Sequence, residues 1–132
     1  MSRQVIRTEK AGLPIGPYSQ AVVANGFVYV AGQAGMDPQT KRIVPGGTAA
    51  ETRQTLENIR AILEAAGCTL ADVVSNTVYL VNLADFQAMN QVYAEYFPQQ
   101  PPARTTVAVA ALPAGAAVEI TSVAVRRSHV GT

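Results

Sequence analysis

Residues 101–120 read PPARTTVAVAALPAGAAVEI, an apolar and largely β-branched stretch with one cation, Arg104, and one carboxylate, Glu119. The pattern predicts two strands, at residues 104–110 and 117–125, joined as a hairpin by a turn at residues 112–115. Burying an ion without a partner costs several kcal/mol. Each charge is therefore expected to reach solvent at a strand end, to pair with the other charge, or to face a cavity that a charged ligand enters.

Strand parity adds a constraint on these two charges. Side chains alternate between faces, so Arg104 and Thr106 share one face of their strand, and Glu119 and Thr121 share one face of theirs. Whether the two faces coincide depends on the strand register, which the sequence leaves open. If both charges face a ligand, this stretch forms a small-molecule site.

Composition limits the other readings. With 132 residues, of which 48% are hydrophobic, we expect one domain, residues 1–132. The net charge of +1 comes without a basic run, which argues against a nucleic-acid partner. The single cysteine, Cys68, fits a reducing compartment and a structural thiol. The N-terminus lacks a signal-peptide core and the apolar run 107–118 is too short to span a bilayer, so we expect a cytoplasmic protein without a membrane partner.

The first half of the chain predicts strands followed by a helix. A short strand at residues 4–7 leads into a Gly- and Pro-rich loop at 12–19. Asn25-Gly26 predicts a tight hairpin between strands 21–24 and 27–32. Thr48 and Glu51 have the spacing of a capping box at a helix start. Gly67 ends this helix. Its buried stripe is expected at Thr52, Leu56, Ile59, Leu63 and Ala66, with i,i+4 pairs Arg53/Glu57 and Arg60/Glu64 on the wet face.

The second half adds a strand at residues 73–81 and a second helix. Asn82 is an N-cap candidate for this helix, and Pro98 ends it. Its stripe is Phe86, Met89, Asn90, Tyr93 and Phe97. Asn90 is polar among large apolar residues, so it must find hydrogen bonds, as a tether to the fold or toward a ligand. Tyr18 likewise either packs half-buried or offers its hydroxyl to a ligand.

The order of elements predicts an α+β domain with two helices on one face of a mixed sheet. The opposite face has no helix left to cover it, although its strands are apolar. Burial against copies of the same chain, with cyclic closure, would cover that face.

Several segments together resemble the RidA (YjgF-type) family of reactive-intermediate deaminases. They occur in order along nearly the whole chain: Gly16-Pro17-Tyr18-Ser19-Gln20, Ala31-Gly32-Gln33, Glu64-Ala65-Ala66-Gly67-Cys68, Asn90 before Tyr93, Pro102-Ala103-Arg104, Val118-Glu119-Ile120 and Ala124-Val125-Arg126-Arg127. The resemblance implies a chorismate-mutase-like fold and a homotrimer cored by a barrel of sheets, with sites in the clefts between subunits. It also implies hydrolysis of 2-imino or enamine acids, such as 2-iminobutanoate and 2-iminopropanoate, to 2-oxo acids and ammonia, without metal or other cofactor.

By the same resemblance, Arg104 would bind the substrate carboxylate and Glu119 would activate the attacking water. Gly32 and Thr106 would contribute backbone contacts, and Tyr18 and Asn90 would line the cleft. Many relatives carry Ser-Gly and Arg-x-Cys where this chain has Ala31-Gly32 and Arg104-Thr105-Thr106, which leaves substrate preference open.

Three other readings remain open at this point. Arg104 and Glu119 could form only an ion pair between strands or subunits. The chain could bind 2-oxo or amino acids as a regulator, without turnover. A ribonuclease-like function is a further alternative, for which the sequence offers one histidine, His129, and no basic stripe.

Overall fold

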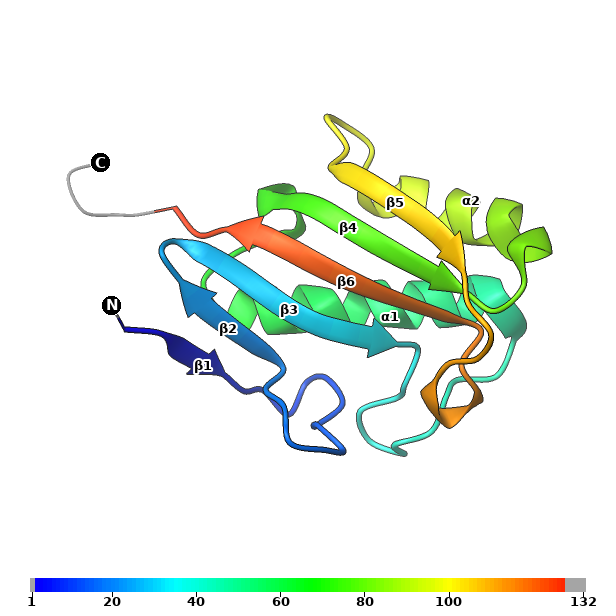
Figure 1. The fold of residues 1–132 in the computed structure, drawn as a ribbon, viewed down its shortest axis with the longest axis horizontal. Coiled ribbons are helices and arrows are strands. Elements are labelled where there is room, and N and C mark those ends of the chain that lie inside the picture. Colours follow the sequence, from blue (N-terminus) through cyan, green and yellow to red (C-terminus); the bar gives the residue numbers. More distant parts are fainter. Residues whose placement is uncertain (1, 128–132) are drawn as a thin grey trace.

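The computed structural model describes residues 2–127, which form a single mixed sheet with two α-helices (Figure 1). The elements are β1 (Gln4–Ile6), β2 (Ala21–Ala24), β3 (Phe27–Ala34), α1 (Gly47–Ala65), β4 (Val73–Leu80), α2 (Phe86–Tyr96), β5 (Ala103–Ala108) and β6 (Val118–Val125). The six strands lie in the order β1-β2-β3-β6-β4-β5, and β4 and β5 pair in parallel while the other pairs are antiparallel. The α+β prediction is confirmed.

Both helices cover the same face of the sheet and lie behind it in Figure 1. The core between the layers is apolar, because β6 buries Val118, Ile120 and Ala124 while α1 buries the predicted stripe that includes Leu56 and Ile59. Burial of these side chains supplies the main driving force for the two-layer packing.

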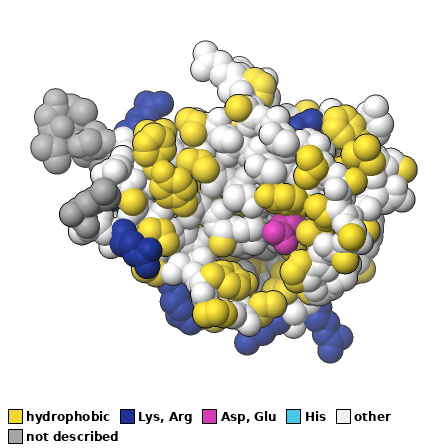
Figure 2. All heavy atoms as spheres, viewed as in Figure 1, with side chains coloured by type: hydrophobic (Ala, Val, Ile, Leu, Met, Phe, Trp, Pro, Cys, Tyr) yellow, Lys and Arg dark blue, Asp and Glu magenta, His cyan; other side chains and the backbone are white. Residues whose placement is uncertain are grey.

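The opposite face carries no helix and exposes large apolar side chains. In β3, Phe27 and Tyr29 are 39% and 50% exposed, whereas Val28 and Val30 between and beside them are buried. Figure 2 shows hydrophobic side chains spread over this face. We call this helix-free side of the sheet the open face.

The predicted hairpin at Asn25-Gly26 is confirmed. Both turn residues have positive φ, 53° and 79°, which is the backbone conformation that two-residue hairpin turns require. The turn brings Ala24 opposite Phe27, so β2 and β3 pair without a register shift.

The hairpin predicted within residues 101–120 is wrong. β6 pairs with β3 on one side and β4 on the other, and β5 lies at the edge, parallel to β4. Parallel neighbours need a crossover connection, and α2 provides it between β4 and β5. The burial patterns explain the order: alternate residues of β6 are fully buried, which suits a central strand, whereas no residue of β5 is, which suits an edge.

The predicted capping box is also wrong. Gly46, with φ 115°, precedes α1 and makes no side-chain cap. The Thr48 hydroxyl donates instead to Asp85 Oδ2 (2.8 Å), and Glu51 Oε1 accepts from the Ala117 amide (2.8 Å). These side chains therefore tie α1 to the turn before α2 and to the segment before β6. The end of the helix is as predicted, since Gly67 follows it with φ 81°.

The predicted i,i+4 ion pairs on α1 do not form. Arg53 reaches across to Glu95 on α2, with two nitrogen–oxygen contacts of 3.0 and 3.3 Å. Arg60 pairs with Glu57 at 3.0 Å, in i,i+3 spacing. A two-point contact between guanidinium and carboxylate is stronger than a single contact along one helix, which favours the link between the helices.

Three smaller predictions have mixed outcomes. Asn82 Oδ1 accepts from the Ala84 amide, so it caps a short 3-10 turn in front of α2, and not α2 itself. Cys68 is buried, as expected of a structural thiol. His129 lies outside the described residues. Between residues 2 and 127, no helix has both the length and the apolar character needed to cross a membrane.

Gly35 sets how closely β3 approaches α1. A Cβ atom at this position would lie 2.6 Å from the Glu51 carbonyl oxygen and 2.7 Å from its Cα. Both are backbone atoms, so the helix itself would have to move.

We expect Gly35→Ala to lower the free energy of unfolding by about 2 kcal/mol, because it overpacks the contact between sheet and helix. Gly16→Ala is the matched control, since its Cβ would meet only the Tyr18 ring, at 3.5 Å. Urea denaturation of both variants checks this. Equal stability of the two variants would contradict the proposed contact.

Candidate functional site

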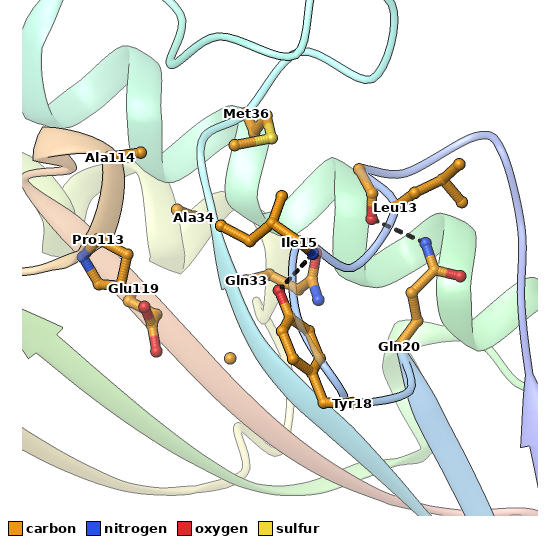
Figure 3. A pocket seen from close by; sticks show the side chains of 12 residues that line it. Leu13, Ile15, Tyr18, Gln20, Gln33, Ala34, Met36, Pro113, Ala114 and Glu119 are labelled. Carbon is orange, nitrogen blue, oxygen red and sulfur yellow. Dashed lines mark hydrogen bonds between the residues drawn. The ribbon is translucent and has the colours of Figure 1, made fainter.

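A cavity of about 180 Å³ opens on the open face of the sheet. Three segments form it: the loop at residues 12–18, the end of β3, and the connection into β6 (Figure 3). Most of its side chains are apolar, among them Leu13, Ile15, Met36 and Pro113, and Glu119 is the acidic residue that lines it. The cavity can therefore enclose a small organic molecule against one carboxylate.

Glu119 enters this cavity from β6, opposite Ala34 of β3. Among residues 2–127, no group donates a hydrogen bond to its carboxylate and no cation pairs with it. Burial raises the pKa of the Glu119 carboxyl above its ordinary value. Such a group can take and return a proton more readily near neutral pH than an exposed glutamate can.

Gly32 provides the space that Glu119 occupies. A Cβ atom at residue 32 would lie 2.9 Å from Glu119 Cδ and closer still to Oε2. The strand is irregular here, because a register shift between Val30 and Gln33 interrupts the alternation of side chains. The sequence resemblance implies backbone contacts for Gly32. The structure adds a further role, because the missing side chain at residue 32 leaves room for the Glu119 carboxyl group.

Tyr18 also lines the cavity. Its hydroxyl accepts a hydrogen bond from the Ile15 amide (3.3 Å), so it closes its own loop while its proton remains available to donate (Figure 3). The ring is 49% exposed. Both readings of Tyr18, as a packing residue and as a hydroxyl donor to a ligand, stay compatible with this position.

Gln20 is a site residue that the sequence reasoning missed. It is buried, its Nε2 donates to the carbonyls of Thr8 and Gly12 (both 2.9 Å), and its Oε1 accepts from the Thr8 amide (2.7 Å). These bonds hold the loop that forms one wall of the cavity. The sequence could have indicated Gln20, because a glutamine side chain directly before an apolar strand needs hydrogen-bond partners once it is buried.

The apolar wall was missed as well. Met36 and Pro113 come from two connections that are far apart in the sequence, and Ala114 beside Pro113 adopts φ 60°. No local pattern indicates that these connections meet, so this part of the cavity follows only from the three-dimensional fold.

Arg104 and Asn90 meet on the other side of the sheet. Arg104 Nη1 donates to Asn90 Oδ1 (2.8 Å), and the guanidinium carbon lies 4.7 Å from the Tyr93 ring centroid and 5.5 Å from that of Phe86. Asn90 therefore tethers α2 to β5. Thr106 lies two residues farther along β5, on the same face as Arg104, as parity predicted.

The predicted site residues thus form two groups, separated by the sheet. Glu119 pairs with Tyr79 of β4, and Arg104 pairs with Asn76 of the same strand. Residues 76 and 79 point to opposite faces, and Asn76 contacts Tyr93 on the helix side. An ion pair between Arg104 and Glu119 within one chain is therefore excluded. Glu119, Gly32 and Tyr18 lie together at the cavity.

Within residues 2–127, no three His, Cys, Asp or Glu side chains come close enough to share a metal ion. The reactive group that the cavity offers is the partly buried carboxyl group of Glu119, next to apolar walls.

The raised pKa of Glu119 predicts a pH-dependent effect on stability. Burial makes the folded chain bind this proton more tightly than the unfolded chain, so ionised Glu119 destabilises the fold above its folded pKa. Glu119→Gln should therefore raise the free energy of unfolding at neutral pH. The gain should shrink as the pH falls toward the unfolded value of about 4.3. Urea unfolding at neutral and acidic pH checks this, and a gain independent of pH would contradict it.

Known proteins resemble this chain over nearly its whole length. The family model described as endoribonuclease L-PSP matches residues 8–126. A RutC family protein of Pyrococcus horikoshii is 53% identical over 122 residues, which cover 92% of this chain and 97% of the relative. The 2-iminobutanoate/2-iminopropanoate deaminase of Capra hircus is 50% identical over 124 residues, which cover 94% of this chain and 90% of the relative.

The solved structures agree. The crystal structure of RidA from an Antarctic Psychrobacter has a TM-score of 0.90 and 46% sequence identity, and the match covers 92% of this chain and 98% of that one. The sheet, its two helices and the sequence motifs thus all match, and the chain belongs to the RidA (YjgF-type) family.

Proposed function

We propose that this protein hydrolyses reactive 2-imino and enamine acids, such as 2-iminobutanoate and 2-iminopropanoate, to 2-oxo acids and ammonia. The observation that carries the proposal is Glu119, a carboxyl group without an internal partner at the wall of an apolar cavity. The relative from Capra hircus, named for this activity and 50% identical, supports it.

Glu119 acts as the acid–base group. The imine enters protonated on nitrogen. Glu119 accepts a proton from water as the water oxygen bonds to the imine carbon, and the carbon–nitrogen π electrons return to nitrogen, which leaves a neutral amine. Glu119 then gives this proton to the amine nitrogen, the carbon–nitrogen bond breaks to release ammonia, and the hydroxyl proton passes to the Glu119 carboxylate as the oxygen becomes the oxo group. The raised pKa of Glu119 suits both steps, since the group must take a proton and give it back.

Arg104 binds the substrate carboxylate. Asn90 occupies one guanidinium nitrogen, and within residues 2–127 no carboxylate pairs with the others. Its planar fork can therefore make two parallel hydrogen bonds to an incoming carboxylate, which fix position and orientation together. Asn90 and Thr106 lie beside it and Tyr18 and Gly32 beside Glu119, so each group lines its own half of the site.

The two halves must come from different copies of the chain. The cavity opens on the open face, which exposes Phe27 and Tyr29, and β5 with Arg104 is an edge strand. Placing the edge of one copy against the open face of the next would bury apolar surface and bring a guanidinium toward Glu119. Cyclic repetition of this contact closes a ring. A ring of three copies, which the family resemblance implies, would hold three sites between subunits.

The substrate proposal predicts the effect of removing Arg104. Arg104→Ala should lower kcat/KM for 2-iminobutanoate by about 10- to 100-fold and leave the fold intact. This is the loss expected when one charge-assisted hydrogen bond to the substrate is removed. Ammonia release from freshly generated 2-iminobutanoate measures this. Arg53→Ala, which breaks an exposed ion pair, is the control and should keep full activity. Unchanged ammonia release by Arg104→Ala would contradict the assignment. Wild-type protein that binds 2-oxobutanoate without releasing ammonia from the imine would point to a regulatory binder.

The shared site predicts complementation between two inactive variants. Arg104→Ala and Glu119→Gln chains, each of low activity alone, should regain activity when mixed and reassembled. With random mixing of equal amounts, about a quarter of the sites receive both functional groups, so about a quarter of wild-type activity should return.

The control for this mixture is each variant reassembled with itself. A mixture that stays as inactive as its two components would show that the groups do not act across subunits.

A further inference from the structure

A chain of three buried polar side chains, which we call the polar chain, runs beneath Arg104 between the sheet and α2. The Ser122 hydroxyl donates to Asn76 Oδ1 (2.6 Å), and Asn76 Nδ2 donates to the Tyr93 hydroxyl (2.9 Å). Ser122 and Asn76 are 1% exposed and Tyr93 is 5% exposed. Buried polar groups stabilise a fold only modestly even when paired, so apolar residues could fill these positions at little cost to stability.

The polar chain connects the sheet to the Tyr93 ring, which lies against the Arg104 guanidinium. Ser122 and Asn76 are cross-strand partners on β6 and β4, and Asn76 is also the neighbour of Arg104 on β5. Tyr93 belongs to α2 and points toward the sheet, where its hydroxyl accepts the hydrogen bond from Asn76. The ring is thus held at its far end by the sheet, while its face lies 4.7 Å from the Arg104 guanidinium carbon.

Arg104 has few other restraints. Asn90 holds Nη1, and the Phe86 ring lies 5.5 Å away on the same helix. A guanidinium over an aromatic face is attracted by the ring quadrupole and can stack on the ring, so the position of the ring limits the positions open to the guanidinium. Holding the ring in place therefore restrains where the remaining nitrogens of Arg104 can point.

We propose that Ser122, Asn76 and Tyr93 are positioning residues that set the direction in which Arg104 presents its guanidinium to a ligand carboxylate. This inference rests on the carboxylate-binding role proposed for Arg104. The three residues do not touch the substrate, and they act through the guanidinium. Their loss weakens binding of a carboxylate, and it leaves the proton transfers at Glu119, on the other face of the sheet, largely unchanged.

Tyr93→Phe and Ser122→Ala test this, because each removes one hydroxyl and keeps the rest of the side chain. Both should raise KM for 2-iminobutanoate and Kd for 2-oxobutanoate by about 3- to 10-fold, with kcat within about twofold of wild type. Thr52→Val is the control: its buried hydroxyl donates to the Thr48 carbonyl within α1, away from Arg104, and its KM and Kd should not change. Unchanged KM and Kd in Tyr93→Phe and Ser122→Ala would overturn the proposal.

A double-variant comparison separates positioning from a purely structural role. Lysine at residue 104 keeps the charge without the planar fork, so its contact depends less on the ring plane. Tyr93→Phe should therefore weaken 2-oxobutanoate binding much less in the Arg104→Lys chain than in wild type, as calorimetry can measure. An equal loss in both backgrounds would overturn the proposal.

Failure of the proposed function gives a different result. Wild-type protein that binds 2-oxobutanoate but releases no ammonia would refute catalysis, and the coupling between Tyr93 and Arg104 in the binding data would still support the positioning role. Absence of 2-oxobutanoate binding by the wild type would overturn both.

Discussion

The site depends on the alternation of side chains along β6, the strand at the middle of the sheet. Glu119 faces the cavity on the open side, whereas Ser122, three residues later, faces the helices and begins the polar chain that leads to Tyr93. One strand therefore presents Glu119 on one face and the start of the polar chain that reaches Tyr93 on the other. The same alternation places Arg104 and Glu119 of one chain on opposite faces of the sheet. Under the proposed function, a complete site therefore requires two copies of the chain.

The cavity itself is a consequence of two close approaches. Gly32 lets the Glu119 carboxyl lie against β3, and Gln20 holds the facing loop through three hydrogen bonds to backbone groups. The resulting wall is apolar, so it raises the pKa of Glu119 by burial and not by repulsion from another acid. A carboxyl group tuned in this way needs no neighbouring titratable partner to serve in proton transfer.

Local patterns in the sequence predicted local structure well. The Asn25-Gly26 turn, the buried stripe on α1 and the shared face of Arg104 and Thr106 follow from turn chemistry and from side-chain periodicity, and all are present. Strand order was not accessible in this way. The pattern of residues 101–120 fits a hairpin as well as it fits a parallel edge strand followed by a central strand. The choice between them depends on pairing with strands far away in the sequence, which local patterns do not show. The capping box predicted at Thr48 and Glu51 was wrong for a related reason. Both side chains form hydrogen bonds with residues far along the chain, and neither caps its own helix.

In the proposed site, a ligand lies between two copies of the chain, with its carboxylate on Arg104 of one copy and its reacting carbon facing Glu119 of the other. A crystal structure of the assembled protein with 2-oxobutanoate bound tests this directly. We expect two hydrogen bonds from the Arg104 guanidinium to the ligand carboxylate, with the ligand oxo carbon next to the cavity of the neighbouring copy. A ligand bound in the cavity with Arg104 distant from it, or bound to Arg104 with no Glu119 nearby, would contradict the proposed site.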